Sequence, residues 1–452
     1  MLILIFFFTT CNTQTLLDLK QCPEIAEMNI GRAYCSCGVF GLLSGQVRHI
    51  SMAVRSGRLV CGTRGVLLLL LVVLAGTLTI LYRVVQSPLL NQYGILQDHL
   101  EHQLLGNARS TRTILLWNDF FGDPRWKFSW DTLGPQELRD EFRCPVYQCE
   151  ITNQHEFLPA VQLYDAIVFH TAEMFPLIRQ VPSNRSPHQA YVFALMEPPG
   201  ETKHRLDDEG DFYNLTMTYR LDSDIVWPYG TLVDIDTDAV IAPSVRPHWR
   251  KPPDSFNNSV IWNFWPKKTK MAAWFVSHCK TLSKREILAD RLKEFINVDV
   301  YGVCGTHSCA RGDPHCDDML DSDYLFYLAF ENSLCDDYVT EKLFGALQRI
   351  IIPVVFGGAD YSRILPPHSY IDANRFETIS DLAQHMKFVA EDPNEYVSYF
   401  WWRRHYRLIS TSPFCDLCAR LHDPGFSHKT QFYGDIQSWW FNSCRPESQI
   451  LL

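Results

Sequence analysis

The sequence predicts an α/β protein with two parallel sheets that face each other across a cleft, preceded by a single membrane-spanning helix. Three observations predict this fold class: an uncharged apolar run near residue 70, strand-length apolar runs between 112 and 196, and a clear alternation of strands and helices beyond residue 259. Strands that alternate with helices are typical of a parallel sheet. The 452 residues, 46% of them hydrophobic, are enough for two globular domains.

The apolar run GVLLLLLVVLAGTLTILY, Gly65 to Tyr82, has 18 residues and no charge, close to the roughly 20 that a bilayer requires. A buried core helix is the alternative, but a helix without a polar face needs protein on all sides. Four arginines between 48 and 64 precede the run and only Arg83 follows closely, so the positive-inside rule leaves the N-terminus in the cytosol. We therefore expect a cytosolic tail over 1–64, an anchor over 65–82 and a stem over 83–110.

The charge of the chain is distributed unevenly. The net charge is -10, yet residues 1–65 carry six Lys and Arg against three Asp and Glu, which leaves -13 for the rest. A surface that binds polyanions needs clustered positive charge. We therefore expect no nucleic-acid partner.

Ten of the fifteen cysteines follow the predicted anchor, where an oxidising lumen would allow disulfides. Cys415 and Cys418 form a lone CxxC, for which a zinc site is the alternative, but zinc needs two further organised ligands. Acceptor sequons for N-glycans occur at Asn184, Asn214 and Asn257 and fit the same compartment.

The first half of the lumenal part contains the apolar runs TILLW, AIVFH and YVFALM between Thr113 and Met196. We expect them to form half of the structure, one sheet with intervening helices and loops. Glu197 comes directly after the last run and before Pro198 and Pro199. Two prolines make a stiff turn, which would fix the carboxylate at the C-terminal edge of the strand.

A polar segment that contains prolines, residues 242–259, separates this half from the next and predicts a linker or surface crossing. Beyond it the expected order is a strand at 272–277, a helix at 283–295, a strand at 298–302, a strand at 350–356 and a helix at 379–391. This order predicts a second parallel sheet.

The stretch FYLAFENSLCDDYVTEK, residues 326–342, joins two apolar segments of this second half through a polar loop. Thr340 can cap a helix whose apolar positions Leu343, Leu347 and Ile350 share one face. Helix N-termini favour anions such as phosphates, and Lys342 lies in the first turn. The loop is therefore the candidate anion site.

Known nucleotide motifs with several glycines are missing from the sequence. Neither GxGxxG nor GxxxxGK[ST] occurs, which argues against a dinucleotide oxidoreductase and a P-loop NTPase. The Asp-x-Asp at Asp222 and Asp224 could hold a divalent metal, but alone it is a weak signal and a solvated turn is the alternative.

The same loop, together with YRLDSDIVWPYG at 219–230, resembles the signature of the α1,3-fucosyltransferases, glycosyltransferase family 10. The resemblance covers roughly Arg112 to Arg407, and the ending FCDLCARLHDPG resembles the subgroup that modifies the N-glycan core in insects and plants. It implies a type II Golgi membrane protein of GT-B architecture, with two Rossmann-like domains facing a cleft. We expect an acceptor-side domain over 111–255, a GDP-fucose-binding domain over 256–410 and a disulfide-containing C-terminal tail over 411–452.

The resemblance also implies roles for site residues. Asn332, Tyr338, Glu341 and Lys342 would contact GDP-fucose, with Lys342 near the phosphates and Glu341 toward the fucose. Arg285 matches the family arginine that grips the diphosphate, for which a surface ion pair is the alternative. Glu197 would be the general base of an inverting transfer, and Pro198 stands where the family has serine.

The acceptor that the resemblance implies is the innermost N-acetylglucosamine of an N-glycan, supported by the ending and by WWRRHYR at 401–407. For WWRRHYR the alternative is packing and a solvated face, which aromatic-basic runs form more often than sugar platforms. The alternatives are Lewis-type transfer to N-acetyllactosamine, an inactive glycan-binding relative, and a purely structural membrane protein whose polar loop surrounds a disulfide at Cys335. GDP-fucose is the implied donor substrate. The family implies no strictly required metal, with Mn²⁺ or Mg²⁺ able to stimulate.

Overall fold

The computed structural model describes residues 34–37, 50–55, 58–59, 73–79, 110–172, 185–202, 206, 209–310, 313–426, 432–446 and 448–451. The chain separates into two compact units, Met1–Ile95 and Leu96–Leu452. In the first unit, β1 (Tyr34–Cys37), β2 (Ile50–Arg55) and β3 (Arg58–Leu59) form a small antiparallel sheet. Of the predicted anchor, only residues 73–79 are described, and they are helical.

A search of the described residues finds no helix with the length and apolar character needed to cross a membrane. The remaining residues of the predicted anchor, and all of the predicted stem except Ser110, lie outside the described ranges. The prediction of a membrane anchor therefore still rests on the sequence.

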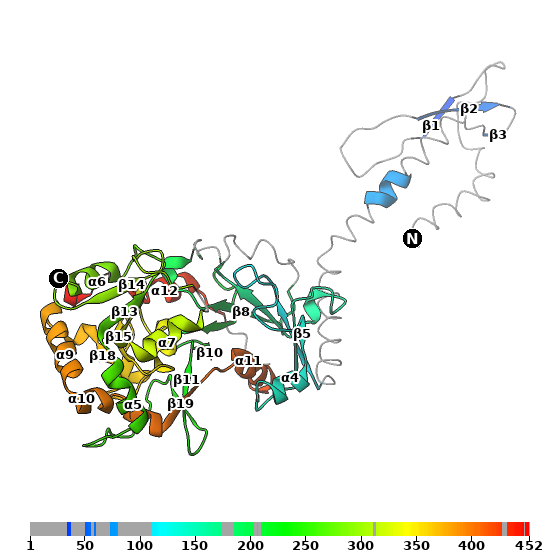
Figure 1. The fold of residues 1–452 in the computed structure, drawn as a ribbon. Helices are drawn as coiled ribbons and strands as arrows, with labels where there is room; N and C mark the ends of the chain where they lie inside the picture. The colour runs from blue at the N-terminus through cyan, green and yellow to red at the C-terminus, as the bar shows by residue number, and fades with distance from the viewer. Residues whose placement is uncertain are drawn as a thin grey trace. The chain divides into compact units, whose positions relative to one another are not determined.

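The second unit contains two larger sheets (Figure 1). The first has the spatial order β10 (Ile225–Val226), β9 (Leu215–Thr218), β8 (Ala190–Leu195), β7 (Ala166–His170), β4 (Arg112–Leu116), β6 (Cys149–Thr152) and β5 (Thr132–Leu133). All neighbours pair in parallel except β5 with β6. Every residue of β7 and β8 is buried, as expected for central strands covered on both faces.

The second sheet is wholly parallel and has the order β14 (Val298–Tyr301), β13 (Lys270–Phe275), β15 (Tyr324–Phe330), β17 (Ile352–Phe356) and β18 (Ile371–Asp372). Its main helices are α6 (Arg285–Leu292), α7 (Pro314–Ser322), α8 (Glu341–Leu347), α9 (Ile379–Glu391) and α10 (Pro393–Ser398). Thr378 caps the helix α9, because its hydroxyl accepts the Asp381 N–H in the usual capping geometry. The two parallel sheets predicted from the alternation of strands and helices are present.

The chain passes between the two large sheets twice, once after β10 and once before α11. A small sheet, β12 (Val240–Ala242), β11 (Thr231–Asp234) and β19 (Tyr406–Ile409), pairs the segments of these two passages. Residues 243–258 are irregular and mostly exposed, as predicted for a crossing, and α5 (Ser259–Phe264) follows them.

After β19 the chain returns to the first sheet. The helix α11 (Pro413–His422) lies beside β10 and α4 (Pro135–Asp140) (Figure 1) and buries Phe414 and Leu417 in the core on one face of that sheet. The helix α12 (Ile436–Phe441) buries Trp440 in the core on the other face. Within the segment predicted as a C-terminal tail, α11 and α12 therefore pack on the first sheet, whereas Ile450 and Leu451 are buried in the core of the second.

Candidate functional site

The strand order of the second sheet indicates where a ligand would bind, and we refer to the region outside the carboxyl ends of β13 and β15 as the crevice. In chain order its strands run 2-1-3-4-5, so the order reverses between β13 and β15. Ligands of open α/β sheets bind outside the carboxyl ends of the strands at such a switch point. The loops that leave β13 and β15 there are joined, because Ser283 donates its N–H to the Asn332 carbonyl at 3.0 Å and its hydroxyl to the Glu331 carbonyl at 2.7 Å.

Both loops hold a residue other than glycine at positive φ, Lys284 at 56° and Asp337 at 58°. Such left-handed positions cost about 1–3 kcal/mol each and cluster at ligand sites. Three buried polar atoms of the same crevice, Arg285 Nε, Asn332 Oδ1 and Ser333 Oγ, have no hydrogen-bond partner among the described residues. Unsatisfied buried groups call for an explanation, and a polar ligand in this crevice would supply one.

Arg285 is buried, with 4% of its surface exposed. Its guanidinium donates to the backbone oxygens of Phe330 at 2.6 Å and His278 at 3.3 Å. Burial lowers the pKa of Arg285, against the opposing charge of Glu331. The alternative of a surface ion pair is therefore wrong: this arginine ties the ends of β13 and β15 together beneath the crevice.

Lys342 lies in the first turn of α8, and its ammonium is hydrogen-bonded to neighbouring side chains. Its ammonium donates to Glu331 Oε2 at 3.1 Å, to Thr340 Oγ1 at 2.7 Å and, more loosely, to Glu341 Oε1 at 3.5 Å. Thr340 stands at the N-cap as predicted, but its hydroxyl donates to the buried Glu331 carboxylate instead of capping the helix. The predicted face is buried at Leu343 and Leu347, whereas Ile350 follows the end of α8.

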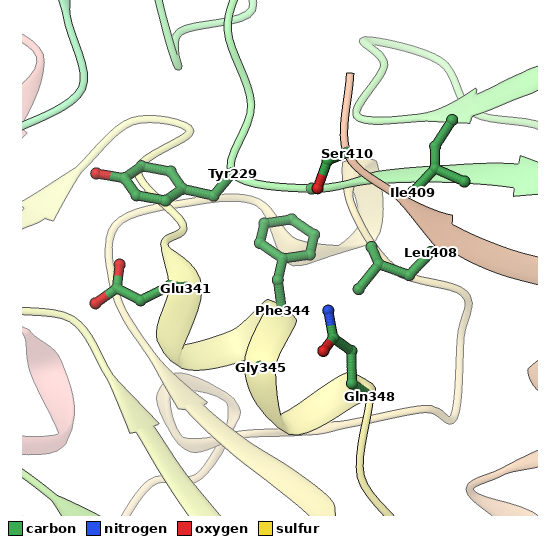
Figure 2. Close-up of a pocket in the computed structure, with 9 residues that line it drawn as sticks. Tyr229, Glu341, Phe344, Gly345, Gln348, Leu408, Ile409 and Ser410 are labelled. Carbon is green, nitrogen blue, oxygen red and sulfur yellow. The ribbon is translucent and has the colours of Figure 1, made fainter. Parts of the chain in front are cut away.

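Glu341 is the exposed member of this group, with 59% of its side chain accessible. The pKa of Glu341 is lowered. Desolvation of the carboxylate acts to raise this pKa, but the charge of Lys342 and hydrogen bonds to the carboxylate outweigh it. Glu341 also lines a cavity of about 230 Å³. In Figure 2, Glu341 and Gln348 project from α8 on either side of Phe344, and they face Tyr229 and Leu408 of β19.

Glu197 reaches the same crevice from the first sheet. It follows β8, and the turn after it buries Pro198 and Pro199, as the two prolines predict. The Tyr338 hydroxyl donates to Glu197 Oε2 over 3.4 Å, a long contact of the kind that tightens when substrate binds. Burial raises the pKa of Glu197, and the Glu341 charge raises it further while Lys342 opposes the rise.

A hydrogen bond also joins the two sequence motifs, residues 219–230 and 326–342. The Leu221 N–H donates to Asp337 Oδ2 at 3.0 Å, which links YRLDSDIVWPYG to the loop after β15. Tyr338 packs against Tyr219 with ring centroids 4.9 Å apart. The structure therefore brings together all six residues predicted for the site, namely Glu197, Arg285, Asn332, Tyr338, Glu341 and Lys342.

The Asp-x-Asp does not form a shared ligand pair. Asp222 accepts two hydrogen bonds from Arg220, at 2.8 and 2.6 Å. Asp224 Oδ2 accepts from the Thr216 N–H at 3.0 Å and from the Tyr433 hydroxyl at 2.8 Å. The two carboxylates are engaged by different partners, which favours the alternative of a structural turn.

All ten cysteines beyond the predicted anchor form disulfides, which an oxidising lumen would allow. Cys415 and Cys418 do not bond to each other: they bond to Cys144 and Cys149 and fasten α11 to the first half. Another disulfide, Cys335–Cys444, joins the antiparallel strands β16 (Leu334–Cys335) and β20 (Cys444–Arg445). It anchors the loop that leads to Tyr338.

The predicted glycosylation sites differ in their surroundings. Asn257 is exposed. Asn214 is only 8% exposed, and its side chain accepts the Tyr191 N–H at 2.8 Å. Because an attached glycan must reach solvent, the folded structure disfavours Asn214 as an acceptor. Asn184 lies outside the described residues.

Sequence reasoning gave no role to Glu331, which proves central to the crevice. Its carboxylate is 1% exposed and accepts from the Thr340 N–H and hydroxyl and from Lys342. The available signal was an acid directly after seven buried strand residues, since a carboxylate at such a position needs partners. In the cluster WWRRHYR, Trp401 and Trp402 are both buried in the core, which favours the alternative that these two rings serve packing.

Comparisons with known proteins identify the family of the chain. The model of the fucosyltransferase N-terminal domain matches residues 109–230, and that of the glycosyltransferase family 10 (fucosyltransferase) C-terminal domain matches 265–439. A Drosophila melanogaster protein named alpha-(1,3)-fucosyltransferase C is 74% identical over 425 residues, 94% of this chain and 100% of the relative.

Two more distant relatives carry names that state more about the acceptor. The glycoprotein 3-alpha-L-fucosyltransferase A of Drosophila melanogaster is 33% identical, over 75% of this chain and 62% of its own length. The 3-galactosyl-N-acetylglucosaminide 4-alpha-L-fucosyltransferase FUT3 of Bos taurus is 36% identical, over 65% of this chain and 74% of its own. The resemblance found in two short motifs thus extends over most of the chain, which belongs to glycosyltransferase family 10, the fucosyltransferases.

Proposed function

We propose that this enzyme transfers L-fucose from GDP-β-L-fucose to the 3-hydroxyl of N-acetylglucosamine with inversion at the sugar carbon. The observation that carries the proposal is the contact between the Tyr338 hydroxyl and the Glu197 carboxylate. It brings an acid from the first half to the loop of the second half that carries Glu341 and Lys342. A base and a group of cations on facing elements are what an inverting transfer needs.

The proposed reaction is a single displacement. Glu197 accepts the proton of the acceptor 3-hydroxyl as the oxygen forms its bond to the fucose C1. The bond from C1 to the phosphate oxygen breaks at the same time, and its electron pair leaves with GDP. A carboxyl whose pKa is raised by burial is a stronger base than an exposed one and suits this step.

The remaining residues act on the donor. Lys342 faces the diphosphate at the start of α8, where the positive helix end also favours an anion. Arg285 and Asn332 line the crevice at the switch point of the second sheet, and their unpartnered atoms support a polar ligand there. Glu341, lowered in pKa beside Lys342, stays charged and faces the positive charge that develops on the fucose ring.

For the acceptor we propose the innermost N-acetylglucosamine of N-glycans. The ending FCDLCARLHDPG and the relative named glycoprotein 3-alpha-L-fucosyltransferase A support this choice. The cavity beside Glu341 (Figure 2) is the proposed place for part of the acceptor, because it opens next to a donor residue and mixes aromatic with amide and hydroxyl groups. Lewis-type transfer is the competing assignment, supported by the bovine relative.

We also propose a type II protein in the Golgi membrane, anchored by residues 65–82, with its catalytic part lumenal. The uncharged run, the arginines before it and the five disulfides support this topology. The proposed acceptor side spans 111–255 and the GDP-fucose side 256–410. In this scheme the cations of the protein neutralise the diphosphate, so transfer does not require a divalent metal. Added Mn²⁺ or Mg²⁺ only stimulates it.

The test measures GDP-fucose binding and acceptor-dependent GDP release on one preparation. Binding together with release on a truncated N-glycan supports the proposal. Binding without release on any acceptor indicates an inactive glycan-binding relative, and no binding at all rejects donor use. Release on free N-acetyllactosamine but not on the truncated N-glycan favours the Lewis-type assignment.

A further inference from the structure

The buried carboxylate of Glu331 lies between the two cations proposed for the diphosphate. It follows β15, the strand at the switch point, and is 1% exposed. One oxygen accepts the Thr340 N–H at 2.8 Å and the other accepts the Lys342 ammonium at 3.1 Å. The same carboxylate acts electrostatically on Arg285. Among the described residues, Glu331 is therefore a buried acid that acts on both Lys342 and Arg285.

We propose that Glu331 is a positioning residue that keeps the Lys342 ammonium charged and fixed in place beside the proposed position of the donor diphosphate. The inference rests on the proposed function, because it assigns how the donor site maintains its charge. Glu331 does not touch the donor: its oxygens are occupied by Thr340 and Lys342. It acts through Lys342.

Another lysine of the same chain shows what burial does without such a partner. Lys268 is 7% exposed, and its ammonium donates to two backbone oxygens, those of Leu320 at 3.1 Å and Tyr324 at 2.7 Å. Burial lowers the pKa of Lys268 to about 7, although Asp321 and Asp323 oppose the fall from a distance. At Lys268, burial therefore outweighs the two carbonyl partners and the two more distant carboxylates.

Lys342 is half-buried, with 19% of its side chain exposed, yet its pKa is raised. Burial again acts to lower it, and the Glu331 carboxylate is the strongest influence in the other direction. The other charged groups that face Lys342 are Glu341 from α8, Glu197 from the loop after β8, and Arg285 from α6, which opposes protonation. Glu341 is 59% exposed, so solvent screens it and it cannot replace a buried partner.

The sign of the effect gives the test. Without the Glu331 charge, the pKa of Lys342 should fall toward that of Lys268. The ammonium is then present below that pKa and lost as pH rises through it, so donor affinity should fall with rising pH. GDP-fucose is the suitable ligand, because both of its phosphates are esterified and its own charge stays constant through neutral pH.

The experiment is calorimetric titration of the whole protein with GDP-fucose, without acceptor, from about pH 6 to about pH 8.5. Wild-type affinity should stay nearly constant. Glu331→Gln should bind with about wild-type affinity at the acid end and lose about tenfold or more at the alkaline end, the expected size for a lysine whose pKa drops to near neutral. Adding Lys342→Arg to this variant should abolish the pH dependence, because arginine stays charged.

Two control variants separate positioning from folding. Thr340→Val removes the threonine hydroxyl but keeps the carboxylate beside Lys342, so its affinity should not depend on pH. Glu331→Asp keeps the charge and should also give a flat profile with weaker binding. If Glu331→Gln fails to fold, a falling profile in Glu331→Asp overturns the proposal and a flat one supports it.

Other outcomes also decide the matter. A Glu331→Gln profile that is flat, whether at wild-type affinity or uniformly weakened, overturns the proposal, since it shows either no role or a purely structural one. Wild-type protein that binds no GDP-fucose at any pH overturns the proposed function itself, and this inference with it.

Discussion

Replacing Glu197 with glutamine tests the proposed general base with the least disturbance of the fold. Glutamine has nearly the same shape, and its Oε1 can still accept the Tyr338 hydroxyl that contacts Glu197 across 3.4 Å. What it cannot do is take a proton from the acceptor hydroxyl. The substitution therefore removes one chemical step and leaves the contact between the two halves.

The expected size follows from two separate contributions. Loss of a general base lowers turnover by about 10²–10⁴-fold, which corresponds to about 3–5 kcal/mol of transition-state stabilisation. Donor binding should change much less. The hydrogen bond that Tyr338 of the donor loop donates to Glu197 is worth about 1 kcal/mol, so even its complete loss would weaken GDP-fucose binding only about fivefold.

The assay measures kcat for transfer and Kd for GDP-fucose on one folded preparation, across pH. Because burial raises the pKa of Glu197, wild-type kcat/KM should fall as pH falls through that raised value, at a higher pH than an ordinary glutamate would give. The Glu197→Gln variant should lack this acid limb, and azide should not restore turnover, since no covalent sugar intermediate forms. Turnover near wild type would refute the role of Glu197, and loss of donor binding would refute its placement opposite the donor.

The donor loop, the cavity and the glycans give the remaining predictions. Lys342→Ala should weaken both GDP and GDP-fucose in calorimetry, whereas Glu341→Ala should reduce transfer more than GDP affinity; equal small effects would make the loop merely structural. Gly345→Ala should raise the free energy of unfolding by about 0.5–1 kcal/mol in denaturant titration, because the added Cβ meets no atom within 4 Å. Gly345→Leu should raise the KM for acceptor and not for GDP-fucose, and an unchanged acceptor KM would exclude the cavity as an acceptor site. Peptide mapping of secreted protein should find a glycan at Asn257 and none at Asn214.

Much of the sheet architecture is predictable because its strands are buried on both faces. The runs AIVFH and IIIPVVF contain no charge, and they form β7 and β17. The helix predicted at 379–391 has the observed bounds, because its capping threonine and its apolar spacing agree. The strands β6 and β9 were missed, since CEIT and LTMT are short and half polar and therefore show no apolar run.

The site was partly predictable for a related reason. Polar residues that end buried strands or start helices, such as Glu197 and Lys342, can be recognised along the chain. Contacts between distant segments cannot, because they depend on how the two halves meet. The bonds of Cys415 and Cys418 to Cys144 and Cys149, the hydrogen bond from Leu221 to Asp337 and the partners of Glu331 are all of this kind.

The most direct test of the central claim is to find where the enzyme puts fucose. Purified protein is incubated with GDP-fucose and a glycopeptide that carries a truncated N-glycan, and the product is analysed by mass spectrometry and by amidase digestion. The proposed function predicts one fucose on the 3-hydroxyl of the innermost N-acetylglucosamine and a product that resists amidase release. A glycopeptide left unmodified under conditions in which free N-acetyllactosamine is fucosylated would contradict it.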